Sequence, residues 1–484
     1  MKAINKDILK LALPSILANI TVPLVGVADI AVAGHLDAQA ATMIGGIAIG
    51  TMLFDLLYWN FGFLRVGTGG LAAQAYGRGD MKDCARILSR SVGIAFACAL
   101  ALIAIQWIFV KAAFLVVDCT PQVRELASQY FFIRIWAAPA TLGLMALKGW
   151  FIGMQDSVSP MAVDLTVNGM NVFMSIVLAL GIPSLGFEGI GFRGIAAGTV
   201  VAQYSGLLVA LSIVLFKYFR RTISLLGRDD IRGLFSGADT RRFFVMNADL
   251  FVRSLCFIAI YIGFTVISAR YGDILLAVSS IMMKLLMIFS YFTDGFAYAG
   301  EALAGRYIGA KDRSMLSQTV KWTFAWSMGI ALIFMLIYHF AGVPMLRIMT
   351  SDATVVEASR EYLPWLLLMP LIGCAAFTWD GIYIGATASK AIRNSMLWAV
   401  VAFAFVWFAG ILCLDFSAPV PAGLASVAGA AFVADASAGA DASAGDYGRA
   451  AMHILMAAYF AHLLARTIYL SILWRRTSTS LNLS

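Results

Sequence analysis

Charged residues are scarce in this chain of 484 residues, because Asp, Glu, Lys and Arg together make up only 13% of it. Soluble globular domains contain about 25% charged residues. Hydrophobic residues make up 61% of the chain, and a water-soluble fold of this size could not cover that much apolar surface. The composition therefore excludes a water-soluble globular protein and predicts a polytopic membrane protein whose main solvent is lipid.

Side chains and motifs that bind metals or nucleotides are also scarce. The six cysteines form no Cys-x-x-Cys pair and the four histidines have no metal-binding spacing, so we expect no metal site. The glycine-rich stretch Gly67–Gly70 lacks the Lys-Ser/Thr pair of a P-loop, which argues against an ATP-driven pump. We expect no cofactor other than a coupling ion. Because Met1–Lys10 leads directly into an apolar run, we also expect no cleavable signal peptide.

Twelve apolar stretches approach or exceed the length of about 20 residues that a helix needs to cross a bilayer. Each stretch predicts one membrane-spanning helix, so the expected fold class is an all-α membrane protein with twelve transmembrane helices. The stretches cover residues 8–33, 42–68, 88–116, 123–150, 157–182, 189–217, 243–269, 275–303, 316–341, 355–385, 392–415 and 450–474.

Lysine and arginine are distributed unevenly between the two sets of connections. The set that includes both termini and residues 220–242 carries 22 of the 35, and the opposite set carries seven. Because cytoplasmic loops are enriched in Lys and Arg, we predict a multi-pass protein of the inner (plasma) membrane with both termini in the cytoplasm. The net charge of +8 is then a topology signal, and we expect the lipid bilayer, not nucleic acid, as a partner.

Two sequence patterns recur at the same spacing of 232 residues. The segment Gly77–Asp80 returns as Gly309–Asp312, and Gly149–Gly153 returns as Gly381–Gly385. This spacing covers six predicted helices, an even number, so both halves enter the membrane in the same direction. The pattern predicts parallel repeats related by an axis along the membrane normal, an arrangement that secondary transporters use with binding sites between the repeats.

The repeat divides the chain into two lobes of six helices. We assign residues 1–219 to the N-terminal lobe, residues 220–242 to a cytoplasmic connector and residues 243–484 to the C-terminal lobe. Residues 417–448 of the second lobe fit no helix, because they are a low-complexity stretch of Ala, Ser, Gly and Asp. Such a composition is typical of flexible linkers, and it predicts a flexible external loop before the last helix.

Ionisable side chains inside the predicted helices are functional candidates, because each costs about 2.5–3.5 kcal/mol to insert at a helix centre. Asp29 is the strongest of them. It follows Pro23 in the first helix, so a proline that can kink the helix precedes a carboxylate, and burial of a carboxylate favours its protonated form. The pattern indicates a proton or cation site, and the alternative is a structural ion pair.

Charged side chains in the seventh and eighth helices are further candidates for the ion or substrate site. Asp249 and Arg253 are four residues apart, which permits a salt bridge along one helix face. Lys284 and Asp294 are ten residues apart in the eighth helix. For each of these side chains, a role in the site competes with a structural ion pair.

Polar side chains in the fifth and tenth helices complete the set of candidates. Asn168 and Asn171 are three residues apart and share a face, so their amides either line a polar cavity or bond neighbouring helices. Asp380 is flanked by aromatic residues toward the cytoplasmic side of the tenth helix. We interpret it as a second candidate for an ion site.

Several segments resemble the multidrug and toxic compound extrusion (MATE) transporters, in particular their DNA-damage-inducible F (DinF) branch. They are Thr21–Asp29, Gly34–Asp37 and Phe63–Gly77 in the first half, and Asp294–Ala302 and Asp380–Thr387 in the second. The resemblance covers both lobes. It implies a V-shaped pair of six-helix bundles that exports organic cations or other amphipathic small molecules in antiport with H+ or Na+.

The resemblance also implies roles for individual residues. Asp29 matches the first-helix aspartate that the family uses for proton coupling and for attraction of cationic substrate. Asp380 matches the carboxylate used by members with second-lobe cation binding. The chain departs from the family in the fifth helix, where Asn171 is followed one turn later by Ser175 in place of an aspartate. This departure leaves Asp29 without a second acid and leaves the choice between H+ and Na+ open. We expect a monomer.

Three other functions compete with export. A flippase for lipid-linked precursors, from a related superfamily, would have more than twelve helices and a strongly cationic cavity, whereas the cavity candidates here are mixed or acidic. An integral-membrane enzyme needs a constellation such as Ser/His/Asp, which four scattered histidines do not supply. A structural scaffold would not need buried acids at several depths. We therefore expect a transporter and not an enzyme.

Overall fold

The computed structural model describes residues 2–34, 36, 40–115, 117, 119–182, 186–227, 230, 233–235, 238–350, 352–417 and 438–480. Almost all of this part of the chain is helical, and twelve helices or series of helices are long and apolar enough to cross a membrane. The predicted all-α fold with twelve spans is confirmed.

Six spans form the first lobe and six form the second. Short 3-10 or π segments continue some helices within one span. In the first lobe the elements are α1 (Lys2–Gly34), α2 (Ala40–Tyr58), η1 (Trp59–Gly62), α3 (Phe63–Gly77), α4 (Met81–Ala113), α5 (Pro121–Arg134), η2 (Ile135–Ala137), α6 (Ala138–Gly153), α7 (Val158–Leu180), α8 (Phe192–Ile213), η4 (Val214–Tyr218) and η5 (Phe219–Arg221). After η6 (Ile223–Leu225), the second lobe contains α10 (Ala238–Ala269), α11 (Asp273–Gly309), α12 (Arg313–Met349), α13 (Ala353–Gly385), α14 (Ser389–Ser417) and α15 (Ala438–Ser480).

The two lobes repeat their turns at equivalent positions. Asp80 caps α4 by accepting a hydrogen bond from the amide three residues later (2.8 Å), and Asp312 caps α12 in the same way (2.9 Å). Such a cap satisfies an amide that the first turn of a helix leaves unpaired. The residues before the caps, Gly79 and Lys311, both have positive φ angles, of 75° and 58°. The repeat at 232 residues is therefore present in the backbone.

Glycines at the same spacing allow equivalent helices to touch. A Cβ atom at Gly149 of α6 would overlap the carbonyl oxygen of Arg65 in α3, and a Cβ atom at Gly381 of α13 would overlap the carbonyl oxygen of Ala297 in α11. Both pairs are related by 232 positions. The segments Gly149–Gly153 and Gly381–Gly385 thus have the equivalent places that the sequence pattern predicts, and small residues permit this close packing of membrane helices.

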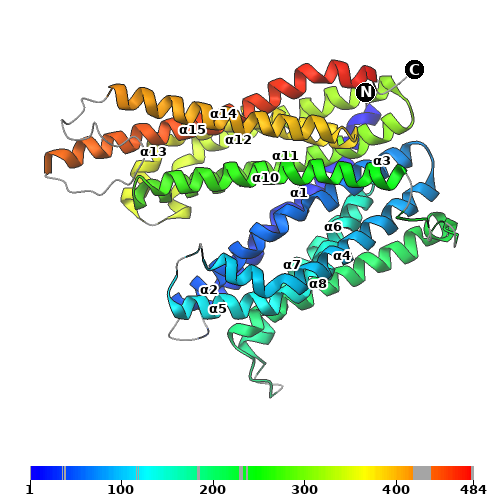
Figure 1. Ribbon diagram of the computed structural model, residues 1–484, viewed down its shortest axis with the longest axis horizontal. Coiled ribbons are helices and arrows are strands. Elements are labelled where there is room, and N and C mark those ends of the chain that lie inside the picture. Colours follow the sequence, from blue (N-terminus) through cyan, green and yellow to red (C-terminus); the bar gives the residue numbers. More distant parts are fainter. Residues whose placement is uncertain are drawn as a thin grey trace.

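The lobes form a V. Figure 1 shows that they lie close together at the end that holds both termini and diverge toward the opposite end. α1 packs against α7 of its own lobe and against α11 of the second, and α10 packs against α14 and also against α3. At the joined end, the side-chain amide of Gln74 donates to the carbonyl of Gly385 (2.9 Å), and that of Gln155 donates to the carbonyl of Ala302 (2.7 Å).

The connector between the lobes is attached to the first lobe in the part that the structure describes. The carboxylate of Asp230 pairs with Lys82 (2.9 Å) and with Arg86, both in α4. Arg90, one turn further along α4, donates to the carbonyl of Leu234 (2.9 Å). α10 then begins at Ala238, inside the segment predicted as connector. The location of this segment in the cytoplasm stays a prediction.

The last helix begins earlier than the sequence analysis predicts. α15 starts at Ala438, inside the 417–448 segment that was assigned to a loop. Alanine recurs at every second position from Ala438 to Ala444, and alanine has the highest helix propensity of all residues. Residues 418–437 lie outside the described part of the chain, so a flexible external loop stays a prediction for them.

Candidate functional site

Asp29 is buried on a helix whose neighbouring side chains are exposed. Its exposed fraction is 5%, whereas those of Leu24 and Val27 are 60% and 65%. The cause is α7, because the hydroxyl of Ser175 in that helix donates a hydrogen bond to Oδ1 of Asp29 (3.0 Å). Ser175, one turn after Asn171, therefore lies directly against the candidate carboxylate.

A second polar contact joins the same two helices. Nδ2 of Asn168 donates to Oγ1 of Thr21 (2.6 Å), two turns before the contact of Ser175 with Asp29. The partners are 147 residues apart in one pair and 146 in the other, so α1 and α7 run parallel in nearly constant register. Pro23 lies between the two contacts, and α7 thus holds α1 on both sides of Pro23.

Asn171 forms its hydrogen bond with a different neighbouring helix from Asn168. Its Nδ2 donates to Oγ1 of Thr199 in α8 (2.9 Å), whereas Asn168 bonds α1. The two amides join α7 to the helix on either side of it. Both amides therefore bond neighbouring helices, and a role in lining a polar cavity stays a prediction.

Arg134 lies near the site, although it is not among the site residues predicted from the sequence. Its guanidinium donates to the hydroxyl of Tyr130 (3.0 Å) and lies 4.8 Å from the ring centre of Phe54. Its charge acts on the carboxylates of both Asp29 and Asp55. A lone arginine in the middle of an apolar span is the signal that could have identified it.

Asp380 has two arginine partners in the second lobe. Its Oδ2 atom accepts hydrogen bonds from Arg253 of α10 (2.7 Å) and from Arg466 of α15 (2.5 Å). Asp380 is 6% exposed and Arg466 only 1%. This geometry argues against a cation site at Asp380, because two guanidinium groups more than neutralise the carboxylate and would repel a third cation.

Asp249 and Arg253 do not pair with each other, although their spacing permits it. Asp249 accepts from Arg393 (2.6 Å) and from the hydroxyl of Ser389 (2.7 Å), both at the start of α14. Arg253 pairs with Asp380 instead. The reason is packing between helices, which brings the buried carboxylate of Asp380 in α13 within reach of the Arg253 guanidinium. The spacing of residues along one helix could not reveal this contact.

Lys284 and Asp294 have separate surroundings along α11. Lys284 is exposed, and its positive charge interacts electrostatically with the carboxylate of Asp55 in the first lobe. Asp294 is half-buried and lies within reach of the charges of Arg65, Arg253, Arg466 and Asp380. It forms no ion pair with any side chain that the structure describes.

An ion pair that sequence reasoning missed connects the two lobes. Arg65 of α3 pairs with the fully buried Glu301 of α11 (3.3 Å), and its guanidinium lies 4.4 Å from the ring centre of Tyr298. A Cβ atom at Gly69, which is the position equivalent to Glu301 in the first lobe, would overlap the Glu301 carboxylate. An ionisable Glu inside a predicted membrane span was the available signal.

Within the described residues, no group of three or more His, Cys, Asp or Glu side chains could hold a metal ion. The polar groups that the structure places around Asp29 and Asp380 are hydroxyls and guanidinium groups. Together with the two carboxylates, these groups allow proton binding and electrostatic attraction of charged ligands.

Comparison with known proteins identifies the family. The sequence model described as MatE matches residues 14–177 and 250–415. The chain belongs to the MATE family. This MATE transporter is 33% identical over 402 residues to the DNA damage-inducible protein F of Escherichia coli K12, and the match covers 83% of this chain and 84% of the relative. It is 23% identical over 398 residues to a probable multidrug resistance protein NorM of Photorhabdus laumondii, covering 80% and 83% of the two chains.

Solved structures support the fold of this MATE transporter. It is similar to an outward-facing multidrug resistance MATE family transporter of the MOP superfamily, with a TM-score of 0.78 and 14% identity over 99% of this chain and 97% of that one. It is also similar to a MOP superfamily transporter from Pyrococcus furiosus, with a TM-score of 0.75 and 16% identity over 99% and 96% of the chains. The protein is therefore a multi-pass membrane transporter with the V-shaped MATE fold.

Proposed function

We propose that the protein exports organic cations or other amphipathic small molecules across the plasma membrane in exchange for protons. Family membership supports transport, and the names of relatives such as the NorM multidrug resistance proteins support small drug-like substrates. The proposal places both termini in the cytoplasm, because Lys and Arg are most frequent in the connections at that end. It takes a monomer as the working unit, since one chain supplies both lobes.

The pair of Asp29 and Ser175 is the observation that carries the proposal. Asp29 is a buried carboxylate with a neutral partner, so its charge can change without breaking an ion pair. Protonation removes the negative charge that attracts a cationic substrate, and deprotonation restores it. A proton and a substrate cation then compete for one carboxylate, and the coupling between them is reciprocal.

Protonation also acts on the shape of α1. The charged carboxylate accepts the Ser175 hydrogen bond, and hydrogen bonds to charged groups are stronger than those to neutral groups. Neutral Asp29 therefore holds α1 against α7 more weakly. Because the contact between Asn168 and Thr21 lies before Pro23, the weakened part of α1 is the part after the proline. A proline is a common site of helix bending.

The arrangement of oxygen atoms favours a proton over a metal cation. Hard metal cations in proteins take about six or more oxygen ligands. The contacts of Asp29 with the described residues bring one carboxylate and one hydroxyl together. That pair suits a proton. In the second lobe, the carboxylate of Asp380 already has two arginine partners, which supports coupling in the first lobe.

Aromatic side chains between the lobes support amphipathic cations as substrates. Trp59 of the first lobe lies edge-on to Phe257 and Tyr261 of the second, with ring centres 6.1 and 5.4 Å apart. Aromatic faces attract organic cations. Asp55, in the same span as Trp59, is exposed and adds a negative charge. Separation of the lobes would expose the aromatic faces to a substrate beside this charge.

Dye transport by the purified protein in liposomes tests the proposal. Ethidium is the cationic probe, and a proton gradient or a sodium gradient is imposed in separate experiments. We expect ethidium movement with the proton gradient and none with the sodium gradient alone. Movement driven by sodium at equal pH on both sides would contradict proton coupling. Failure of both gradients to move any of several cationic dyes would contradict the substrate class.

A further inference from the structure

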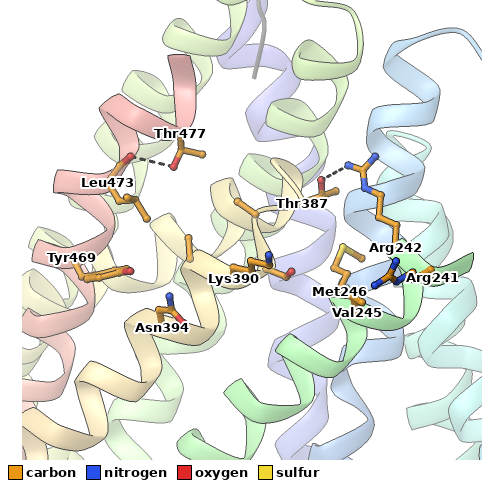
Figure 2. Close-up of a pocket in the computed structure, with 13 residues that line it drawn as sticks. Arg241, Arg242, Val245, Met246, Thr387, Lys390, Asn394, Tyr469, Leu473 and Thr477 are labelled. Atoms are coloured by element: carbon orange, nitrogen blue, oxygen red, sulfur yellow. Dashed lines mark hydrogen bonds between the residues drawn. The ribbon is translucent and has the colours of Figure 1, made fainter. Parts of the chain in front are cut away.

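A cavity opens in the second lobe at the end of the molecule that holds both termini. Its volume is about 780 Å³. Four segments line it, namely the start of α10, the turn between α13 and α14, the start of α14 and the end of α15. Figure 2 shows Lys390 between the side chains of α10 and those of α15. None of the residues assigned to transport above lines this cavity.

The cavity is strongly basic. Arg241, Arg242 and Lys390 line it, and no carboxylate side chain is among the lining residues. Arg242 donates to the hydroxyl of Thr387 (3.1 Å), which lies on the turn between α13 and α14. Arg241 and Lys390 are exposed and form no ion pair with any side chain that the structure describes. Their charges are available to an anion.

Comparison of the two lobes shows that this excess of positive charge is particular to the second lobe. The equivalent turn of the first lobe, between α6 and α7, carries Asp156 at the position of Ala388. Asp156 accepts from Lys217 (2.7 Å) and from the hydroxyl of Tyr218 (2.7 Å). Burial alone would raise the pKa of Asp156, but these hydrogen bonds and those from Ser159 hold it below its usual value. The first lobe thus has a fixed anion where the second has a methyl group.

Apolar side chains form two parts of the cavity wall, beside the hydroxyl and amide groups of Ser389, Asn394 and Thr477. Val245 and Met246 of α10 form one part of it, and Tyr469 and Leu473 of α15 form another. Val245 is 45% exposed, so apolar surface is accessible beside the basic side chains. A ligand that fills this space needs a negative head and an apolar body.

We propose that this cavity binds the phosphate headgroup of an anionic phospholipid, with Arg241 and Lys390 as the contacting cations and the acyl chains along Val245 and Leu473. Basic pockets between transmembrane helices are known to hold anionic headgroups. A free phosphate ion offers the same charge, but it leaves the apolar wall uncovered. The inference does not depend on what the protein transports.

Native mass spectrometry of the purified protein with bound lipid tests this proposal. The protein is mixed with phosphatidylglycerol or with phosphatidylcholine, and the occupancy of the lipid-bound state is measured. We expect retention of phosphatidylglycerol in preference to phosphatidylcholine. In the double variant Arg241→Gln/Lys390→Gln, affinity for phosphatidylglycerol should fall about thirtyfold, given the attraction that each cation contributes near anionic lipid.

A matched variant controls for loss of charge at the same end of the molecule. Arg220→Gln/Arg221→Gln removes two exposed arginines of the first lobe, and we expect unchanged retention of phosphatidylglycerol. Equal losses in the two double variants would overturn the proposal, as would equal binding of the two lipids. Inorganic phosphate in large molar excess over the lipid separates the two sources of the anion. Displacement of the bound lipid by phosphate alone would overturn the lipid assignment.

Discussion

The hydroxyl of Ser175 donates a hydrogen bond to the carboxylate of Asp29 across the interface of α7 and α1, at 3.0 Å. Because a serine hydroxyl does not ionise in the range in which a carboxylate does, the pair carries one titratable proton. A second carboxylate at the Ser175 position would share that proton and split the titration of the pair. The proposed coupling in this transporter therefore depends on one group.

Removal of the Ser175 hydroxyl should weaken the site without abolishing transport. In Ser175→Ala the ionised Asp29 loses its donor, and an unsatisfied buried acceptor costs about 1–3 kcal/mol. We expect a lower free energy of unfolding by that amount and slower ethidium transport that remains proton-driven. Ser212→Ala is the matched control, because Ser212 is exposed and bonds only a carbonyl of its own helix (2.8 Å). An unchanged stability of Ser175→Ala would contradict the assigned bond.

The charge cluster around Asp380 makes a different prediction. Asp380→Asn leaves Arg253 and Arg466 without their common carboxylate, and loss of one partner from a buried ion pair costs about 3–5 kcal/mol. We expect a strong loss of thermal stability. Asp164→Asn provides the control, because its pair with Lys148 is partly exposed (2.8 Å) and such pairs contribute about 1 kcal/mol or less. Similar losses in both variants would contradict the account.

The fold could be predicted from the sequence because lipid imposes a strong constraint. Apolar stretches of sufficient length indicated twelve spans, and the Gly149–Gly153 and Gly381–Gly385 motifs indicated the repeat. The ends of the helices could not be predicted as well. α11 continues to Gly309, six residues past the predicted stretch, because capping and helix propensity extend a helix after hydrophobicity has ended.

The site was predicted in part. Asp29 could be found because an ionisable residue in an apolar helix is costly and stands out. Its partners and those of Asp380 could not, because they come from distant parts of the chain. Asp380 is 127 residues from Arg253 and 86 from Arg466. The four-residue spacing of Asp249 and Arg253 suggested a local pair, but contacts between helices gave each residue a different partner.

Glycines at the repeat should be intolerant of substitution in both lobes. A methyl group at Gly149 or at Gly381 would overlap a backbone carbonyl of the facing helix, and overpacking of this kind costs about 1–3 kcal/mol. We expect Gly149→Ala and Gly381→Ala to lower the thermal unfolding temperature. Gly169→Ala is the control, because no atom lies within 4 Å of its added Cβ. Wild-type stability in either of the first two variants would contradict the close approach.

The contact between the connector and α4 should be lost at low pH. Hydrogen bonds from Arg86, then from Lys82 and from the amide of Gly227, hold the pKa of Asp230 far below its usual value of about 4. A carboxylate whose pKa is lower in the folded state than in the unfolded state stabilises the fold at any pH above its unfolded-state pKa. This stabilisation is lost as the pH falls through the folded-state pKa.

Hydrogen exchange at the Gly227 amide measures this contact, because that amide donates to Asp230 (2.9 Å). We expect protection of the amide at neutral pH, retained protection at pH 4, and loss of protection only in stronger acid. In Asp230→Asn the protection should be weak at every pH. Loss of protection in the wild type between pH 6 and pH 5 would contradict the assigned ion pairs.

Proton release on substrate binding tests the central claim most directly. The purified protein in weakly buffered detergent solution at a pH that leaves Asp29 partly protonated is mixed with ethidium, and the change in pH is recorded. If proton and cation compete for Asp29, binding by the wild type should release protons, up to one per protein molecule. Asp29→Asn should release none. Equal proton release by the wild type and Asp29→Asn would contradict the account and place the exchange at another group.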